Sequence, residues 1–181
     1  PIQSGLGSAS SNAATVIRIL EKLNYKDLKD RDFNNIGADV TFFIRNQDSL
    51  LRGIGNITIK QLFPKYYFLL IKPIQNCSTS EMYKLINLDD LDFDTNFDTN
   101  EINEYDNGND FELLLKEKYD EIESLLNFVK ELPNVIFARL TGSGSCIFAA
   151  FDSKKNAKNS SLIFKNKFPN LWSAVVENNF I

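Results

Sequence analysis

The spacing of apolar residues along the 181-residue chain predicts an alternation of helices and short strands. In its first third the pattern predicts helices over residues 10–23 and 26–34, a strand or a helical turn over 40–44, and strands over 49–52 and 56–60. Phe63-Pro64 then marks the expected domain boundary. A chain of this length is enough for one domain or for two small ones.

Beyond this boundary the pattern is typical of an α+β fold. The continuous apolar run over 66–71 predicts a buried strand, and residues 88–108, rich in Asp, Asn and Glu, predict a solvated loop. The other expected elements are helices over 80–87, 109–132 and 154–168 and strands over 136–140, 146–151 and 172–177. Two helices packed on one face of a mostly antiparallel sheet would bury the apolar stripes of these elements.

Composition narrows the class of protein. Hydrophobic residues make up 43% of the chain and charged residues 24%, as in ordinary globular proteins. The net charge of -4 argues against nucleic-acid binding, and no apolar run approaches the roughly 20 residues of a membrane span. Cys77 and Cys146 are expected to be free thiols in a reducing cytoplasm. Because histidine is absent, any acid–base chemistry must use carboxylates or lysine.

The stretch Pro1–Ser11 joins a glycine-rich turn to the start of the first helix. Gly5 and Gly7 permit backbone conformations that other residues avoid. Unpaired N–H groups and the dipole at a helix N-terminus can bind an anion, most often a phosphate. The Ser10 and Ser11 hydroxyls could bind a phosphate oxygen or a metal ion, or they could simply cap the helix. The stretch is neither a Walker loop nor a dinucleotide fingerprint, so by itself it is a weak signal.

Three separated segments resemble motifs of the GHMP kinases, which phosphorylate small alcohols. Residues 1–14 are similar to the second motif of the family, residues 36–44 to the segment that supplies its catalytic aspartate, and residues 139–149 to its C-terminal glycine-rich motif. The matches run in family order, and a smaller similarity covers residues 109–112. Departures from the family are Ser8 and Ala9 where glycines are usual, Thr41 in place of proline, and Asn56 in place of glutamate.

The resemblance implies the two-domain GHMP kinase architecture. Residues 1–63 would be the remainder of the N-terminal, ATP-binding domain, and residues 64–181 a ferredoxin-like C-terminal domain. The chain would lack the N-terminal third of the family, which holds a catalytic lysine. We therefore expect the chain alone to be inactive.

The resemblance also implies the residues of an active site. Asp39 would be the catalytic aspartate, although an aspartate at a helix start is by default an N-cap. Thr79 would lie beside the substrate, and a helix cap explains it equally well; Asn109 and Glu112 have the spacing of a capping box. The ATP-binding residues would be Pro1, Ile2, Gln3, Ser4, Gly5, Leu6, Gly7, Ser8, Ala9, Ser10 and Ser11. The loop that closes the site, or a simple hairpin turn, would contain Gly142, Ser143 and Gly144.

The implied reaction is the transfer of a phosphoryl group from ATP to a hydroxyl of a cytidine-diphosphate-linked sugar alcohol in the non-mevalonate isoprenoid pathway. Magnesium is implied by this chemistry, although the sequence contains no recognisable cluster of metal ligands. Alternatives are another GHMP kinase, acting on homoserine or a mevalonate-type alcohol, and a non-catalytic phosphate-binding domain. The protein is expected in the cytoplasm.

Overall fold

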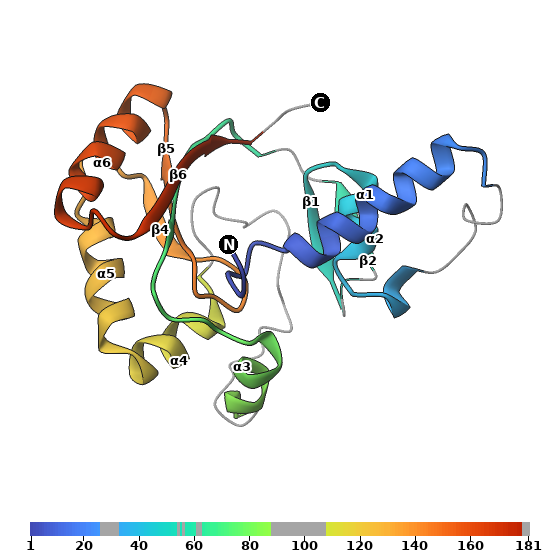
Figure 1. Ribbon diagram of the computed structural model, residues 1–181, viewed down its shortest axis with the longest axis horizontal. Coiled ribbons are helices and arrows are strands. Elements are labelled where there is room, and N and C mark those ends of the chain that lie inside the picture. Colours follow the sequence, from blue (N-terminus) through green and yellow to red (C-terminus); the bar gives the residue numbers. More distant parts are fainter. Residues whose placement is uncertain (26–32, 54, 56, 61–62, 88–107, 179–181) are drawn as a thin grey trace. The chain divides into compact units, whose positions relative to one another are not determined.

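The computed structural model describes residues 1–25, 33–53, 55, 57–60, 63–87 and 108–178 (Figure 1). The described chain divides into two compact units. The N-terminal unit is Gly7–Pro64, and the C-terminal unit combines Pro1–Leu6 with residues 65–178. The boundary between the units therefore falls inside the stretch Pro1–Ser11.

The C-terminal unit is a four-stranded antiparallel sheet with helices on one face (Figure 1). Its strands, in spatial order, are β4 (Phe137–Leu140), β5 (Ile147–Phe151), β3 (Tyr67–Lys72) and β6 (Trp172–Glu177). Its helices are α3 (Thr79–Leu85), α4 (Asp110–Lys118), α5 (Asp120–Lys130) and α6 (Lys154–Lys167). The expected α+β fold with an antiparallel sheet is confirmed, and the order of strands is that of a ferredoxin-like domain.

The core of this unit lies between the sheet and the helices. Leu69 and Ile71 on β3 are fully buried, whereas Phe68 and Leu70, which point to the opposite face, are only partly buried. This alternation follows from the two-residue period of a strand. Side chains of β4, β5, α4, α5 and α6 complete the core, among them Leu140, Ile147, Leu115, Leu126 and Phe164.

The prediction of one long helix over 109–132 is wrong, because α4 and α5 are separated at Tyr119. The backbone of Tyr119 is extended, with φ −140° and ψ 97°, so the helical hydrogen bonding stops there and restarts. The charges fit two helices: α4 ends with Lys116 and Lys118, and α5 begins with acidic residues. Each sign of charge therefore lies at the helix end whose dipole it stabilises.

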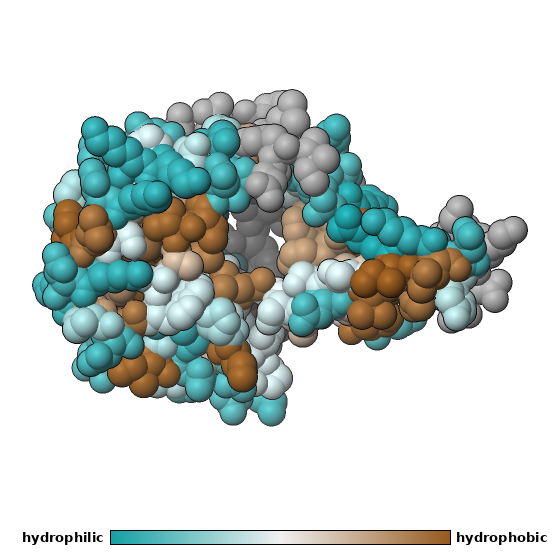
Figure 2. Space-filling view, turned by 45° about the horizontal axis from the view of Figure 1, so that its top comes forward, coloured by the Kyte–Doolittle hydropathy of each residue, from teal (hydrophilic) through white to brown (hydrophobic). Residues whose placement is uncertain are grey.

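The N-terminal unit packs α1 (Ser8–Lys22) against α2 (Val40–Arg45), with a hairpin of β1 (Ser49–Arg52) and β2 (Ile57–Lys60). The run over 40–44 is thus a helix rather than a strand. Among the residues described in this unit, the buried core consists of Ala14, Ile17 and Val40. Along α1 and its C-cap, an exposed apolar stripe is formed by Val16, Ile19 and Leu23 (Figure 2).

Two sequence predictions fall largely on residues that the structure does not describe. Of the helix expected over 26–34, only residues 33 and 34 are described, and they belong to the 3₁₀ turn η2 (Phe33–Asn35). The solvated loop expected over 88–108 lies outside the described residues except for Gly108. Among the described helices, none is long and apolar enough to cross a membrane.

Candidate functional site

The first half of the glycine-rich stretch is bound to the C-terminal unit through its carbonyl groups. Cys77 N donates to Gln3 O at 3.5 Å, and Cys146 N donates to Ser4 O at 3.1 Å. The Thr141 hydroxyl donates to Gly5 O at 3.1 Å. These bonds join residues 3–5 to two loops that lie far along the sequence, those after β3 and after β4.

Gly5 and Gly142 allow the two backbones to approach closely. Gly5 has a φ of +71°, and a Cβ at this position would overlap the carbonyl oxygen of Thr141. Gly142 has a φ of +51°, and a Cβ there would lie 2.8 Å from Gly5 O. Only glycine fits both positions without moving the main chain. The structure therefore brings the predicted ATP-binding residue Gly5 together with the predicted closing loop.

The closing loop, Thr141–Ser145, connects β4 to β5. Its ends are joined by the bond from Thr141 N to Cys146 O at 2.9 Å, and Gly144 N donates to Thr141 O at 3.0 Å. Ser143 and Ser145 are buried, and the Ser145 hydroxyl donates to the carbonyl of Gln75. These internal and external hydrogen bonds stabilise the conformation of the loop.

Thr79, the predicted substrate residue, contacts the same loop. It is the first residue of α3, and its hydroxyl lies 2.9 Å from the hydroxyl of Ser143. Thr79 is exposed, whereas Ser143 is only 7% exposed. Two predicted site residues separated by 64 positions are thus hydrogen-bonded.

The second half of the stretch begins α1 in the N-terminal unit. The N-cap is Gly7, in a left-handed conformation and without a side-chain capping bond, and Ser11 N donates to Gly7 O at 2.9 Å. The helix therefore starts at Ser8, two residues earlier than predicted, and Ser10 and Ser11 are not its caps. The Ser11 hydroxyl donates instead to Ser8 O at 3.1 Å. The first-turn N–H groups receive no side-chain bond from the cap, which suits an anion site.

Asp39 occupies the N-cap position of α2, yet its carboxylate makes no capping bond and is exposed. The alternative that Asp39 serves only as a cap therefore loses its physical basis. Its segment lies beside the start of α1: a Cβ on Gly37 would be 3.7 Å from Ser10 Oγ, and one on Gly7 would be 2.8 Å from the Phe43 ring. The expected grouping of Asp39 with the closing loop involves both units and stays a prediction.

Lys72, the last residue of β3, is a buried cation. Its ammonium donates to Pro73 O at 2.9 Å, Gln75 O at 2.6 Å and Asn76 Oδ1 at 3.1 Å, which uses all three donors. Burial lowers the pKa of Lys72. Since its hydrogen bonds are all to the segment that follows β3, Lys72 stabilises the turn leading to α3.

Both cysteines are free, as the sequence suggested, and both are buried. Burial raises the pKa of the Cys77 thiol, and it raises the pKa of the Cys146 thiol to about 11. Thiols with such pKa values are weak nucleophiles at neutral pH, so neither is suited to covalent catalysis. Within the described residues, no group of three or more histidine, cysteine, aspartate or glutamate side chains could hold a metal ion.

Asn109 and Glu112 are residues whose role in the site was missed in the sequence. Asn109 does cap α4, since its Oδ1 accepts from Phe111 N at 3.0 Å. Its Nδ2, however, donates to Leu140 O at 3.0 Å and to Gly142 O at 2.9 Å, and Glu112 accepts from Leu140 N at 3.1 Å. The similarity of residues 109–112 to the kinase family was the signal that could have identified them.

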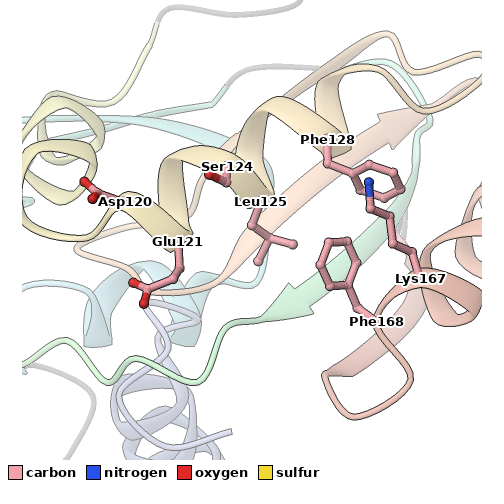
Figure 3. Close-up of a pocket in the computed structure, with 7 residues that line it drawn as sticks. All are labelled: Asp120, Glu121, Ser124, Leu125, Phe128, Lys167 and Phe168. Carbon is pink, nitrogen blue, oxygen red and sulfur yellow. The ribbon is translucent and has the colours of Figure 1, made fainter.

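A cavity of about 430 Å³ lies elsewhere, between α5 and the end of α6 (Figure 3). The Phe128 ring forms one wall of the cavity, and the Lys167 ammonium lies over this ring, 4.3 Å from its centroid. The residues that line the cavity are Asp120, Glu121, Ser124, Leu125, Phe128, Lys167 and Phe168. None of the predicted site residues is among them.

Comparisons with known proteins agree with the residues that carry the resemblance. Residues 92–170 match the family described as GHMP kinases C terminal. The chain is 37% identical over 162 residues to 4-diphosphocytidyl-2-C-methyl-D-erythritol kinase of Blochmanniella pennsylvanica, covering 87% of this chain and 54% of the relative. It is 32% identical over 181 residues to the protein of the same name from Pelagibacter ubique, covering 95% and 64%. The chain thus spans less than two thirds of the length of these relatives.

Solved structures agree on the fold. The crystal structure of 4-(cytidine 5'-diphospho)-2C-methyl-D-erythritol kinase superposes with a TM-score of 0.72 at 19% identity, covering 99% of this chain and 68% of the other. Homoserine kinase from Cytophaga hutchinsonii gives a TM-score of 0.61 at 17% identity, covering 99% and 67%. At these identities the likeness concerns the fold alone.

Proposed function

Because this chain belongs to the GHMP kinase superfamily, we propose that it takes part in the ATP-dependent phosphorylation of a hydroxyl of 4-diphosphocytidyl-2-C-methyl-D-erythritol. The observation that carries the proposal is the similarity to kinases of that name, at 37% and 32% identity over 87% and 95% of this chain. The uncapped N-terminus of α1 and the free carboxylate of Asp39 support it.

In this proposal the start of α1 binds the phosphates of ATP. The N–H groups of Ser8, Ala9 and Ser10 have no side-chain cap, and the positive end of the helix dipole lies there. Residues 1–6 supply the first half of the loop, and the hydrogen bonds to Gln3, Ser4 and Gly5 hold it in place. Magnesium, which neutralises phosphate charge when bound, would be held by the phosphate oxygens.

Asp39 accepts the proton of the attacking hydroxyl. A carboxylate that spends no hydrogen bond on capping can orient and deprotonate an alcohol placed within hydrogen-bonding distance. Thr79, exposed and bonded to Ser143, contributes a hydroxyl to the substrate side, and the closing loop keeps that hydroxyl in position.

The test is the substitution Asp39→Asn. Since the relatives are longer than the region they share with this chain, the assay uses a chimaera in which the unmatched part of the Blochmanniella relative is joined to it. We expect kcat to fall by about 10²–10⁴-fold, the loss of a positioned base, with little change in the KM for ATP. The melting temperature should hardly change, because the side chain makes no capping bond.

Asp120→Asn is the matched control, because Asp120 is also an exposed aspartate at a helix start. Its turnover should be normal. Full activity in Asp39→Asn would remove this residue from the mechanism. Phosphorylation of homoserine in preference to the cytidine-linked alcohol would change the substrate while leaving the kinase assignment intact.

A further inference from the structure

The N-terminus of α4 is bonded to the outer edge of the sheet by two side chains. β4 is an edge strand, so the outward N–H and C=O groups of its residues lack a neighbouring strand. At Leu140, the last residue of β4, Glu112 accepts from the N–H at 3.1 Å and Asn109 donates to the carbonyl at 3.0 Å. Both polar groups of one strand residue are thus satisfied by side chains of the α4 N-terminus.

Besides its bond to Leu140 at the sheet edge, Asn109 donates a hydrogen bond to the closing loop. Its second Nδ2 hydrogen is donated to Gly142 O at 2.9 Å, inside the closing loop. With Oδ1 accepting from Phe111 N, the carboxamide uses both of its donors and its acceptor oxygen at once. Serine or aspartate would serve equally well as a helix cap, so capping alone does not explain the carboxamide.

The loop residue that Asn109 holds is central to the predicted site. A Cβ on Gly142 would lie 2.8 Å from Gly5 O, and the adjacent Thr141 donates its hydroxyl to that oxygen. Ser143, on the other side, is bonded to Thr79. A shift of Gly142 would therefore be transmitted to both halves of the candidate site that this unit contains.

We infer that Asn109 is a positioning residue, whose carboxamide fixes the closing loop through Leu140 and Gly142. The effect of Asn109 on turnover rests on the proposed function, whereas its effect on the conformation of the closing loop does not. Glu112 supports the same attachment, and Lys116 at 2.9 Å and Lys130 at 3.3 Å hold its carboxylate in place.

The discriminating substitution is Asn109→Asp. Aspartate keeps the oxygen that accepts from Phe111 N, so α4 stays capped. It loses both donors and places a carboxylate against two carbonyl oxygens. Ser153→Ala is the control: it removes the side-chain bond to Asn156 N at 3.3 Å that caps α6, without touching the closing loop.

The first measurement uses ¹⁵N-labelled chain and does not depend on activity. Hydrogen exchange at Gly144 N–H, which is bonded to Thr141 O, should quicken by about ten- to thirtyfold in Asn109→Asp, as expected for the loss of two neutral hydrogen bonds. Ser153→Ala, which also loses a capping bond in the same unit, should match the parent at Gly144. Equal exchange at Gly144 in Asn109→Asp and in the parent would overturn the inference.

The second measurement is kinetic and uses the chimaera with ATP and the cytidine-linked alcohol. Assayed at a temperature well below the melting temperatures of both variants, Asn109→Asp should lower kcat by at least tenfold, while Ser153→Ala should keep kcat. A loosened loop with normal kcat would reduce Asn109 to a structural residue and refute the positioning role. A parent chimaera without activity would contradict the proposed function, and the exchange data would then still decide whether Asn109 fixes the loop.

Discussion

Replacing Gly5 by alanine should release residues 3–5 from the rest of the C-terminal unit. The added Cβ would overlap Thr141 O and lie 2.9 Å from Gly144 N, and these are backbone atoms of a loop bonded on several sides. The clash cannot be relieved by rotating a side chain. The simplest relief is detachment of residues 3–5, which gives up the hydrogen bonds to Gln3 O, Ser4 O and Gly5 O.

These three bonds set the size of the effect. At about 1 kcal/mol each, their loss lowers the free energy of unfolding of the C-terminal unit by about 3 kcal/mol. Gly108→Ala is the matched control, because Gly108 has a φ of +81° and a Cβ there would meet nothing within 4 Å. It should show only the strain of a left-handed alanine, about 1–2 kcal/mol.

Urea unfolding followed by the fluorescence of Trp172 measures the difference. Trp172 is the only tryptophan of the chain and lies on β6, so its signal reports the C-terminal unit. Hydrogen exchange adds a local readout, since the N–H groups of Cys77 and Cys146 should lose protection in Gly5→Ala and keep it in Gly108→Ala. Equal stability and equal protection in the two variants would refute the close approach of Gly5 to the closing loop.

Three further predictions concern charge, thiols and packing. Burial raises the pKa of the Glu112 carboxyl, but the hydrogen bonds from Lys116 and from the Leu140 N–H, with the charge of Lys130, lower it by more. The pKa of Glu112 therefore lies below its ordinary value. The ionised Glu112 side chain thus stabilises the folded protein at neutral pH, and this contribution is lost as pH falls through the folded-state pKa. When stability is measured at decreasing pH, the free energies of unfolding of Glu112→Gln and of the parent should therefore converge. With a pKa of about 11, Cys146 is about one-thousandth thiolate at pH 8, so Ellman's reagent should label it far more slowly in folded than in urea-unfolded protein. In denaturant unfolding, Phe164→Ala should lower the free energy of unfolding by about 3–5 kcal/mol, because Phe164 is fully buried. Leu162→Ala should change it by no more than about 0.5 kcal/mol, because Leu162 is 63% exposed.

Local patterns were sufficient to predict most of the elements. The apolar run that became β3 lies at the centre of the sheet, between β5 and β6, and its composition alone predicts a buried strand. The break at Tyr119 was missed because the apolar spacing continues from Leu115 to Ile122 across it. Only the reversal of charge there, basic and then acidic, indicates two helix ends.

The candidate site was less predictable, because its bonds join positions far apart in the sequence. Asn109 has the sequence signature of a cap, and it is one, but its other two partners lie 31 and 33 positions away. Similarly, the sequence around Gly5 indicates a turn before a helix and contains no sign that its carbonyl is bonded to Thr141, 136 positions further on. Long-range pairing of this kind depends on the completed sheet.

The attachment of residues 3–5 also has a consequence for biosynthesis. At about 5–20 residues per second, the ribosome needs between about 7 and about 27 s to advance from Gly5 to Thr141. During that interval the glycine-rich segment has been synthesised, while its hydrogen-bonding partners around β4 and β5 do not yet exist. The carbonyl groups of Ser4 and Gly5 must therefore stay in water until β4 and β5 emerge. Docking of this segment is therefore among the late events of co-translational folding, and a chaperone that binds short apolar or glycine-rich stretches would meet it in its unattached form.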